Sequence, residues 1–388
     1  MKNVAWNKVK VGSLCTRVTS GGTPKSTNAE YYDNGKIPWL NSKEVNFSHI
    51  YSTEKFITEK GLAESSAKWI EKNSVIVAMY GATAGQVAIA KIPLTTNQAC
   101  CNLTIDDKLA DYRYVYYYLW NQYQVLSGLA NGGAQQNLNA QIIKEFEIQL
   151  PELSVQKSIS EILFSLDEQI RINNTINHNL EEQAKTIFKS WFVDFEPFQD
   201  GGFVDSEHGQ IPIGWRIGTF GEIANISSGK RPSKKSVLKS EECMFPLIGA
   251  SCVMGFTCSY LYDTPIIVTG RVGTHGIIQY FDEKCWPSDN TLVIQSKFLN
   301  FAYQYLHTVD FTTLNRGSTQ PLIIQSDIKK QSCLIAPEYV MLNFEEKLQS
   351  IRVLIQNNLC ENYKLAQLRD ALLPKLMSGE IEVSEVEV

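Results

Sequence analysis

Mostly apolar residues recur at every seventh position, in two rows, along residues 152–192. This stretch contains no glycine. The leading row is Ile159, Leu166, Asn173, Leu180 and Ile187, and the trailing row is Leu163, Ile170, Asn177, Ala184 and Trp191. Such rows line one face of an α-helix, and a helix of this length extends about 60 Å. A long helix with one narrow apolar face needs a helical partner, so the pattern predicts one.

The same pattern returns 185 residues later in the chain. The leading row becomes Phe344, Ile351, Asn358, Leu365 and Leu372, and the trailing row becomes Leu348, Ile355, Asn362, Arg369 and Leu376. Apolar residues match apolar residues, except that Arg369 stands where the first helix has Ala184. Two matched helices predict an internal duplication. A globular segment between them favours an antiparallel pair, with Asn173 and Asn358 as a buried polar pair that fixes the register.

The segments before each helix also repeat, in a fixed order of strands and polar glycine loops. The short strand at 37–41 matches 245–250, the glycine loop at 79–85 matches 269–276, and the loop at 130–138 matches 314–322. Single strands are expected at 95–105 and at 286–294, and aromatic helices at 111–123 and 298–307. We therefore predict globular domains at residues 1–150 and 201–336, and helical spacers at 151–200 and 337–388.

Composition narrows the functional class. A chain of 388 residues with 44% hydrophobic residues can build more than one core. It has no apolar run of membrane-spanning length, and its N-terminus is too polar for a signal peptide, so we expect a cytoplasmic protein with all nine cysteines reduced. The net charge of −5 excludes a polycationic nucleic-acid binder, so any DNA contact must come from local basic surfaces.

Several short motifs carry a family resemblance. They are GGTP at 21–24, IPWL at 37–40, GATAG at 81–85, IFKSWFVDFEPF at 187–198 and LLPKLMSGEI at 372–381. In this order, around two matched helices, they resemble the specificity subunit of a type I restriction–modification system over essentially the whole chain. The second half departs in detail, with SGKRPSK for the glycine–proline loop and GRVGTHG for GATAG.

The resemblance implies an α+β fold in which two α/β target-recognition domains are separated by two long antiparallel helices. These helices would form an intramolecular coiled coil, with a pseudo-twofold duplication of the whole. It also implies that each domain recognises one half of a bipartite sequence in double-stranded DNA, through the major groove. The implied partners are two copies of a DNA methyltransferase subunit and, for cleavage, an ATP-dependent restriction subunit.

No catalytic, cofactor-binding or metal-binding motif is visible in the sequence. It has no G-x-x-x-x-G-K-[ST] phosphate loop, no Rossmann fingerprint with a spaced acid, no adenine-methyltransferase motif and no histidine pair at zinc-ligand spacing. We therefore expect a chain that is no enzyme by itself, uses no cofactor and leaves the chemistry to partner subunits.

The polar loops supply the candidate DNA-binding residues. Arginine matches guanine, asparagine or glutamine matches adenine, and serine or threonine matches either. In the first half the candidates are Thr23, Lys25, Tyr80, Thr83, Asn97, Gln98, Gln135, Gln136 and Asn137. In the second half they are Lys230, Arg231, Ser233, Lys234, Arg271, Thr274, His275, Asn290, Arg316, Ser318, Thr319 and Gln320.

Each of these features also has a plainer interpretation. A single polar glycine loop is usually a solvated turn, and the basic run at 230–235 is usually an exposed loop. The aromatic residues at 112–120 could stack on bases, but their helical spacing favours a core. Two other protein classes stay open: a self-contained methyltransferase or nuclease, which the missing motifs disfavour, and a coiled-coil scaffold or adaptor that binds no DNA.

Overall fold

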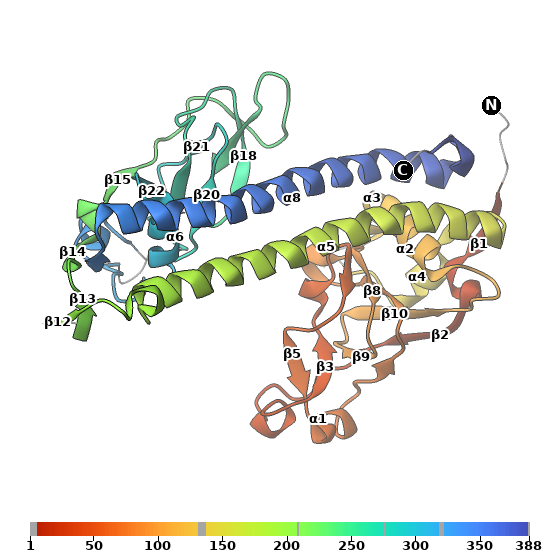
Figure 1. Cartoon of the computed structure of the whole chain (residues 1–388). Helices are drawn as coiled ribbons and strands as arrows, with labels where there is room; N and C mark the ends of the chain where they lie inside the picture. Colours follow the sequence, from red (N-terminus) through yellow and green to blue (C-terminus); the bar gives the residue numbers. More distant parts are fainter. Residues whose placement is uncertain (1–5, 131–136, 208, 275, 318–321, 387–388) are drawn as a thin grey trace. The chain divides into compact units, whose positions relative to one another are not determined.

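The computed structural model describes residues 6–130, 137–207, 209–274, 276–317 and 322–386 (Figure 1). It divides the chain into two compact units, one made of Met1–Ile172 with Cys360–Val388 and the other of Asn173–Leu359. Two long helices, α5 (Leu153–Phe192) and α8 (Glu338–Ser378), each begin in one unit and end in the other. Each unit therefore contains a globular domain and a part of both helices. In the described part of the chain, no helix is long and apolar enough to cross a membrane.

The helix pair has the predicted bounds and the predicted direction. In the second unit, α5 and α8 are joined by a hydrogen bond from Asn358 to Asn177 and an ion pair between Arg352 and Glu181. The later residue of α5, Glu181, contacts the earlier residue of α8, Arg352, as expected for an antiparallel pair. In the first unit, Ile159 and Leu163 of α5 share a core with Leu373, Leu376 and Met377 of α8.

The apolar face of α5 follows the predicted rows except in its last turns. Ile159, Leu166 and Asn173 of the leading row are buried. Near the end of the helix, Phe188 and Phe192 are buried, whereas the predicted Ile187 and Trp191 are half-buried at the margin of the same core. A straight helix has 3.6 residues per turn, so its buried face drifts away from a strict seven-residue repeat. The sequence rows did not allow for this drift.

The asparagines lie between the helices, but the pairing differs by one turn from the prediction. Nδ2 of Asn358 donates to Oδ1 of Asn177 at 2.8 Å. Asn173, the predicted partner of Asn358, is one turn earlier in α5 and only 2% exposed. The 185-residue offset identifies residues that correspond in the sequence repeat, such as Asn173 and Asn358. Corresponding residues need not be in contact, because in an antiparallel pair a residue before the centre of one helix meets a residue after the centre of the other.

In the part of it that the structure describes, the first domain contains two main sheets and four short α-helices. One sheet has the order β2-β10-β7-β8-β4, the other has the order β5-β3-β9-β6, and β1 pairs with β11. The strands are β1 (Asn7–Lys10), β2 (Cys15–Ser20), β3 (Ile37–Leu40), β4 (Ser48–Ile50), β5 (Lys55–Ile57), β6 (Trp69–Ile70), β7 (Val75–Ala78), β8 (Val87–Ala90), β9 (Leu94–Thr96), β10 (Cys100–Ile105) and β11 (Glu147–Leu150). The helices are α1 (Glu59–Ala63), α2 (Tyr112–Asn121), α3 (Tyr123–Leu129) and α4 (Ala140–Glu145).

The second domain repeats this plan, with two described α-helices in place of four. Its sheets have the orders β15-β22-β19-β20 and β16-β18-β17-β21, with separate pairs β14-β23 and β12-β13. The strands are β12 (Phe203–Ser206), β13 (Gly209–Pro212), β14 (Arg216–Thr219), β15 (Ala224–Ser228), β16 (Lys235–Ser236), β17 (Phe245–Ile248), β18 (Val253–Thr257), β19 (Ile266–Gly270), β20 (Gln279–Phe281), β21 (Trp286–Pro287), β22 (Thr291–Ser296) and β23 (Ser332–Ile335). The helices are α6 (Leu299–Leu306) and α7 (Gln325–Lys329).

The strand pairing confirms the duplicated α+β fold. The antiparallel series β2-β10-β7-β8 corresponds to β15-β22-β19-β20, and the pair β1-β11 corresponds to β14-β23. One parallel contact also recurs: β3 pairs with β9 as β17 pairs with β21. The first sheet has an additional edge strand, β4, which lies parallel to β8.

Two predicted strands prove to be two strands each, so these predictions were wrong. Residues 95–105 contain the end of β9 and all of β10, which belong to different sheets, with a turn at Asn97 between them. Residues 286–294 are divided in the same way, by a turn at Ser288 between β21 and β22. The turn residues 97–99 and 288–290 are mostly polar, but the apolar and β-branched residues on both sides made each stretch resemble one strand.

The aromatic helix α2 belongs to the core, as its spacing indicated. Tyr114, Tyr116 and Tyr117 are fully buried. Asp111 caps the helix by accepting hydrogen bonds from the N–H groups of Arg113 and Tyr114. These rings therefore stabilise the domain and are not available to stack on bases.

Buried polar contacts attach the first domain to the long helices. The Tyr117 hydroxyl donates to Asp167 of α5 at 2.6 Å, and Arg369 of α8 donates to the same carboxylate at 2.7 Å. The guanidinium of Arg369 also lies 4.5 Å from the ring centroid of Trp120 on α2. Arg369, which interrupted the apolar row in the sequence, thus fastens a domain helix to the helix pair.

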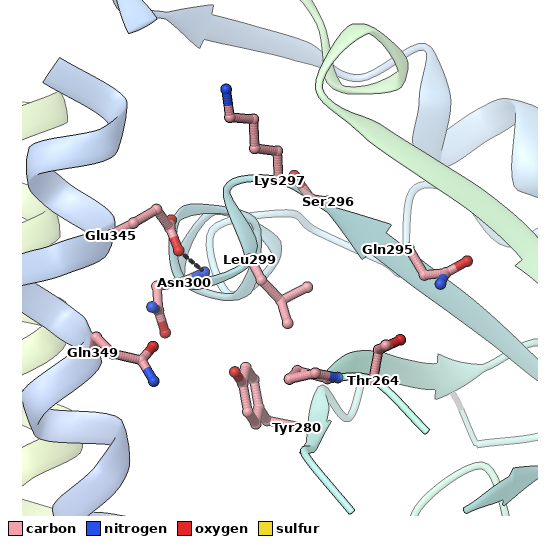
Figure 2. A pocket seen from close by; sticks show the side chains of 10 residues that line it. Thr264, Tyr280, Gln295, Ser296, Lys297, Leu299, Asn300, Glu345 and Gln349 are labelled. Atoms are coloured by element: carbon pink, nitrogen blue, oxygen red, sulfur yellow. Dashed lines mark hydrogen bonds between the residues drawn. The ribbon is translucent and has the colours of Figure 1, made fainter. Parts of the chain in front are cut away.

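The second domain is attached by a different set of contacts. Glu345 of α8 accepts hydrogen bonds from the N–H groups of Asn300 and Phe301 at the start of α6, at 2.9 and 2.8 Å, and Figure 2 shows this carboxylate beside Asn300. Burial raises the pKa of Glu345, against the opposing effect of these two donors. Arg352 donates to Glu181 at 2.7 Å and lies 4.0 Å from the Tyr303 ring centroid.

One prediction about the cysteines was wrong. We expected only reduced thiols, but the structure joins Cys243 and Cys258 in a disulfide. These residues flank β17 and β18, whose antiparallel register places Phe245 opposite Thr257. The strand pairing brings the two cysteines together, and nothing in their spacing along the chain indicated it.

Candidate nucleic-acid interface

The candidate loops of the first unit leave one edge of its five-stranded sheet. β2 ends at Ser20, β7 ends at Ala78, and β10 begins at Cys100. In the antiparallel register, Cys100 lies opposite Ala78 and Cys101 lies opposite Ser20. The loops after β2 and β7 and the turn before β10 therefore gather at this place, which we call the loop edge.

Six backbone hydrogen bonds fix the segments at the loop edge to one another, and we call them the loop frame. They close the turn before β10 and bind it to the loop after β2, to β3, to the end of β7 and to the segment before α4. The donors and acceptors are Gly21 N to Cys100 O, Gly22 N to Thr96 O, Asn97 N to Leu40 O, Cys100 N to Asn97 O, Met79 N to Ala99 O, and Leu138 N to Met79 O, at 2.7–3.4 Å.

The second unit has the same loop frame at its own loop edge, where β15, β19 and β22 meet. The bonds are Gly229 N to Thr291 O, Lys230 N to Pro287 O, Ser288 N to Ile248 O, Thr291 N to Ser288 O, Arg271 N to Asn290 O, and Ile323 N to Arg271 O, at 2.8–3.1 Å. Each bond has its counterpart at the corresponding place of the first unit. The loops that matched in sequence are thus held in the same way.

A tryptophan supports the frame in both units, but from different strands. Trp39 of β3 donates its indole N–H to the carbonyl of Gly22 at 2.9 Å. Trp286 of β21 donates to the carbonyl of Lys230, the counterpart of Gly22, at 2.7 Å. β3 corresponds to β17, the partner strand of β21. The indole ring therefore comes from the other strand of this pair in the second unit, but it makes the equivalent hydrogen bond.

Glycine is required where the loop lies against the turn. A Cβ atom at Gly21 would lie 2.1 Å from the carbonyl oxygen of Thr96, and one at Gly229 would lie 2.2 Å from that of Ser288. Both distances are too short for non-bonded atoms. At these two positions the protein's own backbone occupies the space that a side chain would need.

At one position of its turn, the loop frame has an exposed residue in both units. In the first unit this residue is Gln98, which follows Asn97; the second has Asp289, which follows Ser288. Asn97 is 7% exposed, and its side-chain oxygen accepts from the N–H of Ala99. Its side chain therefore closes the turn, a structural role that differs from the base contact that we predicted for it.

The structure brings several predicted residues of the first unit together. Thr23 Oγ1 donates to Oε1 of Gln98, which joins the loop after β2 to the turn. Tyr80 and Asn137 form an isolated β-bridge, and both are exposed. Thr83 Oγ1 donates to the carbonyl of Ser42 at 3.1 Å. Lys25 is exposed on the loop after β2.

In the second unit, predicted residues line a groove of about 610 Å³ between the loop after β15 and the turn before β22. Arg231, Ser233 and Asn290 are predicted residues, and the groove adds Lys235 and Asp289. Lys230 and Thr274 are exposed, and the half-buried Arg271 belongs to the loop frame.

Two predicted cations of the second unit are engaged in ion pairs. Arg316 makes a bidentate contact with Asp327 of α7, with both N–O distances at 2.6 Å. Lys234 lies 3.3 Å from Glu242 on the exposed surface. The bidentate pair engages Nε and one terminal nitrogen of the guanidinium, which gives Arg316 a structural role and leaves only its remaining N–H groups for a base.

Some predictions cannot be compared with the structure. Gln135, Gln136, His275, Ser318, Thr319 and Gln320 lie outside the described residues.

Asp289 is the residue that sequence reasoning missed. The matched segments 95–103 and 286–294 already placed it opposite Gln98. The predicted set of DNA-binding residues contains no carboxylate and therefore omits it. A carboxylate is also a base-reading group, since it accepts a hydrogen bond from cytosine N4.

Comparisons with known proteins agree with this architecture. The model of the family described as type I restriction modification DNA specificity domain matches residues 3–182 and 212–337. The type I restriction enzyme MjaIX specificity subunit of Methanocaldococcus jannaschii is 28% identical over 412 residues, covering 98% of this chain and 94% of that protein. A putative type I specificity subunit of Mycoplasma genitalium is 30% identical over 329 residues, covering 80% of this chain and 82% of that protein.

A solved structure shares the fold. The crystal structure of the type I restriction–modification system S subunit from M. genitalium superposes with a TM-score of 0.60 at 21% identity, covering 97% of both chains.

Proposed function

Since this chain belongs to the family of type I restriction modification DNA specificity domains, we propose that each of its globular units recognises one half of a bipartite target in double-stranded DNA. The chain supplies DNA sequence specificity, and its relatives are named for that role. The domains that we assign to this task are residues 1–150 and 201–336.

The observation that carries the proposal is the loop frame at both loop edges. An adaptor that binds only through its helices has no need to build the same polar edge twice. Each edge gathers side chains whose donors and acceptors match base edges in the major groove, together with backbone N–H groups and cations that suit phosphates. Gln98, Asn137, Arg231 and Asn290 are the amide and guanidinium groups best placed for base contacts.

We assign the long helices two tasks, to set the gap between the half-sites and to carry partner subunits. Two copies of a methyltransferase subunit would dock on their exposed faces, and an ATP-dependent restriction subunit would join for cleavage. The chain itself is then the non-catalytic member of the complex. The buried asparagines would fix the register of the pair, because a mismatched register leaves an amide unpaired in an apolar seam.

The test is to purify the chain with its cognate methyltransferase subunits and select from a pool of random duplexes. We expect enrichment of a two-part motif with a fixed gap. Replacing residues 201–336 with the corresponding domain of a relative should then change one half-site and leave the other intact. Binding without sequence preference, or no binding, would support the scaffold alternative, and a change in both half-sites would refute the assignment of one domain to each.

The helix proposal has a separate test. Deleting residues 173–176 and 358–361 removes about one turn, or ~6 Å, from each helix and keeps Asn177 in α5 and Asn362 in α8. We expect the gap in the motif to shorten by about two base pairs, at 3.4 Å per pair. An unchanged gap in a variant that folds and binds DNA would refute the proposal that the helices set the spacing of the half-sites.

A further inference from the structure

Gln98 and Asp289 occupy the same position at the tip of the turn in the two loop frames. We propose that they are equivalent base-reading residues, with Gln98 selecting adenine in one half-site and Asp289 selecting cytosine in the other. This inference rests on the proposed function and adds to it the base that each turn selects.

The loop frame makes these two positions comparable. In each unit, backbone hydrogen bonds hold the residues before and after the tip, and the preceding residue, Asn97 or Ser288, is buried. The tip residue is exposed in both units. In the second unit the next residue, Asn290, is exposed as well. A rigid backbone that holds an exposed side chain at a fixed place is what direct readout of a base requires, because the side chain loses little freedom on binding.

Gln98 has the hydrogen-bonding groups for adenine. Its amide oxygen accepts from Thr23 and keeps a second lone pair, and its NH₂ group provides two donors. Adenine presents an N6 donor beside an N7 acceptor in the major groove, which matches the amide in a bidentate pair. The contact with Thr23 would hold the amide with its oxygen toward the loop after β2, and thereby fix its orientation.

Asp289 has only acceptors when ionised, so it selects a base that presents a donor. Guanine presents two acceptors in the major groove and thymine presents one, so both repel a carboxylate there. Adenine places its N7 acceptor next to its N6 donor, whereas cytosine presents its N4 donor alone. Arg231 lines the same groove and can donate to the guanine of that pair, so the two side chains together match a cytosine–guanine pair.

The Asp289 side chain is not needed to close its turn. The N–H of Thr291 donates to the carbonyl of Ser288 at 3.0 Å, and the Thr291 hydroxyl donates to the same oxygen at 2.7 Å. The turn is thus closed by its neighbours, and the exposed carboxylate remains for a ligand. Position 289 should therefore tolerate substitution without loss of the fold.

The experiment uses the full chain in complex with its methyltransferase subunits and determines the preferred motif for two near-isosteric variants. Asp289→Asn converts an acceptor into an amide, and Gln98→Glu makes the reverse change. We expect Asp289→Asn to replace cytosine by adenine at one position of one half-site. Gln98→Glu should replace adenine by cytosine at one position of the other. The preference at each position should change by about 5- to 150-fold, the usual discrimination of one good base contact.

Asp263→Asn is the matched control, since this exposed acid precedes β19 at the end away from the loop edge. It should leave the motif unchanged. Asp289→Ala should lose the cytosine preference without gaining another, and thermal melting should show that all variants are folded. Unchanged motifs in Asp289→Asn and Gln98→Glu would refute the inference, as would a wild-type motif with no adenine in the first half-site or no cytosine in the second. A wild-type complex without any bipartite motif would instead refute the proposed function.

Discussion

The two loop edges have the same backbone and different charges. Among the described candidate residues, the first edge has a single cation, Lys25. The second has Lys230, Arg231 and Arg271, and its groove adds Lys235. The loop frame consists of backbone N–H and C=O groups, so the side chains at its edge can change without loosening it. This is how one scaffold can serve two different DNA sequences.

The two units also differ in how charges hold the domain to the helices. Asp167 of α5 and Arg352 of α8 occupy matching positions at the 185-residue offset, yet one is an acid and the other a base. Asp167 pairs with Arg369, and Arg352 pairs with Glu181. In both pairs the acid belongs to α5 and the arginine to α8, so pairing α5 with α8 satisfies both charges.

The largest expected effect comes from replacing Arg369 or Arg352 singly, because each replacement removes one partner of an ion pair. Asp167 and Arg369 have side-chain exposures of 11% and 14%, so Arg369→Met leaves a carboxylate buried without its cation. We expect a loss of about 3 kcal/mol in the free energy of unfolding. Arg352→Met should cost less, about 2 kcal/mol, because Glu181 is 33% exposed and can regain water.

Equilibrium urea unfolding of the full chain measures both effects. The double variant Asp167→Asn with Arg369→Met is the control, since removing both charges of a buried pair is often nearly neutral. It should recover most of the loss. If the two single variants lose the same free energy of unfolding, the burial of the acid does not determine how much each ion pair stabilises the chain.

The charge difference at the loop edges should appear in the salt dependence of DNA binding. Each phosphate contact contributes about 0.9 to the slope of log K against log salt concentration. Replacing Lys230 and Lys235 with alanine should lower the slope by about 2, and Lys25→Ala by about 1 at most. Titrations of the complex with a duplex that carries its motif, at several salt concentrations, measure this. Equal slopes for the two variants would mean that the units share the phosphate contacts evenly.

The smallest effect should come from the extra strand of the first sheet. His49 on β4 stacks on Phe164 of α5 at 4.9 Å between ring centroids, and its side chain is 6% exposed. Burial lowers its pKa, and Lys91 adds to the effect, whereas Asp167 and Glu168 oppose it. Protonation therefore favours the unfolded chain. The stabilisation is present above the unfolded pKa of about 6.5 and is lost as pH falls through the folded value.

A His49→Gln variant tests this. Its thermal midpoint should fall less than that of the wild type between pH 7 and pH 5. Because the corresponding sheet of the second unit has no such strand among its described residues, the loss should appear in the first unit. Parallel pH profiles for the two proteins would assign the acid sensitivity to other groups.

The sequence predicted well what depends on periodic patterns. The bounds of α5 and α8, the aromatic core helix capped by Asp111 and the order of the repeated loops all follow from spacing and local propensity. It failed where distant segments decide the outcome. The division of residues 95–105 at Asn97 depends on which sheet receives each half, and the Cys243–Cys258 disulfide depends on a strand pairing.

By itself, the sequence determined that this protein is a duplication of a globular domain and a long helix, because apolar periodicity and repeated motifs are local properties of a chain. Only the tertiary structure decided which side chains meet. It paired Asn358 with Asn177 and buried Asn97 in a turn. The first contact depends on how two helices align, and the second on backbone hydrogen bonds between separate strands. Both are set by segments far apart in the chain, so no local pattern of residues shows them.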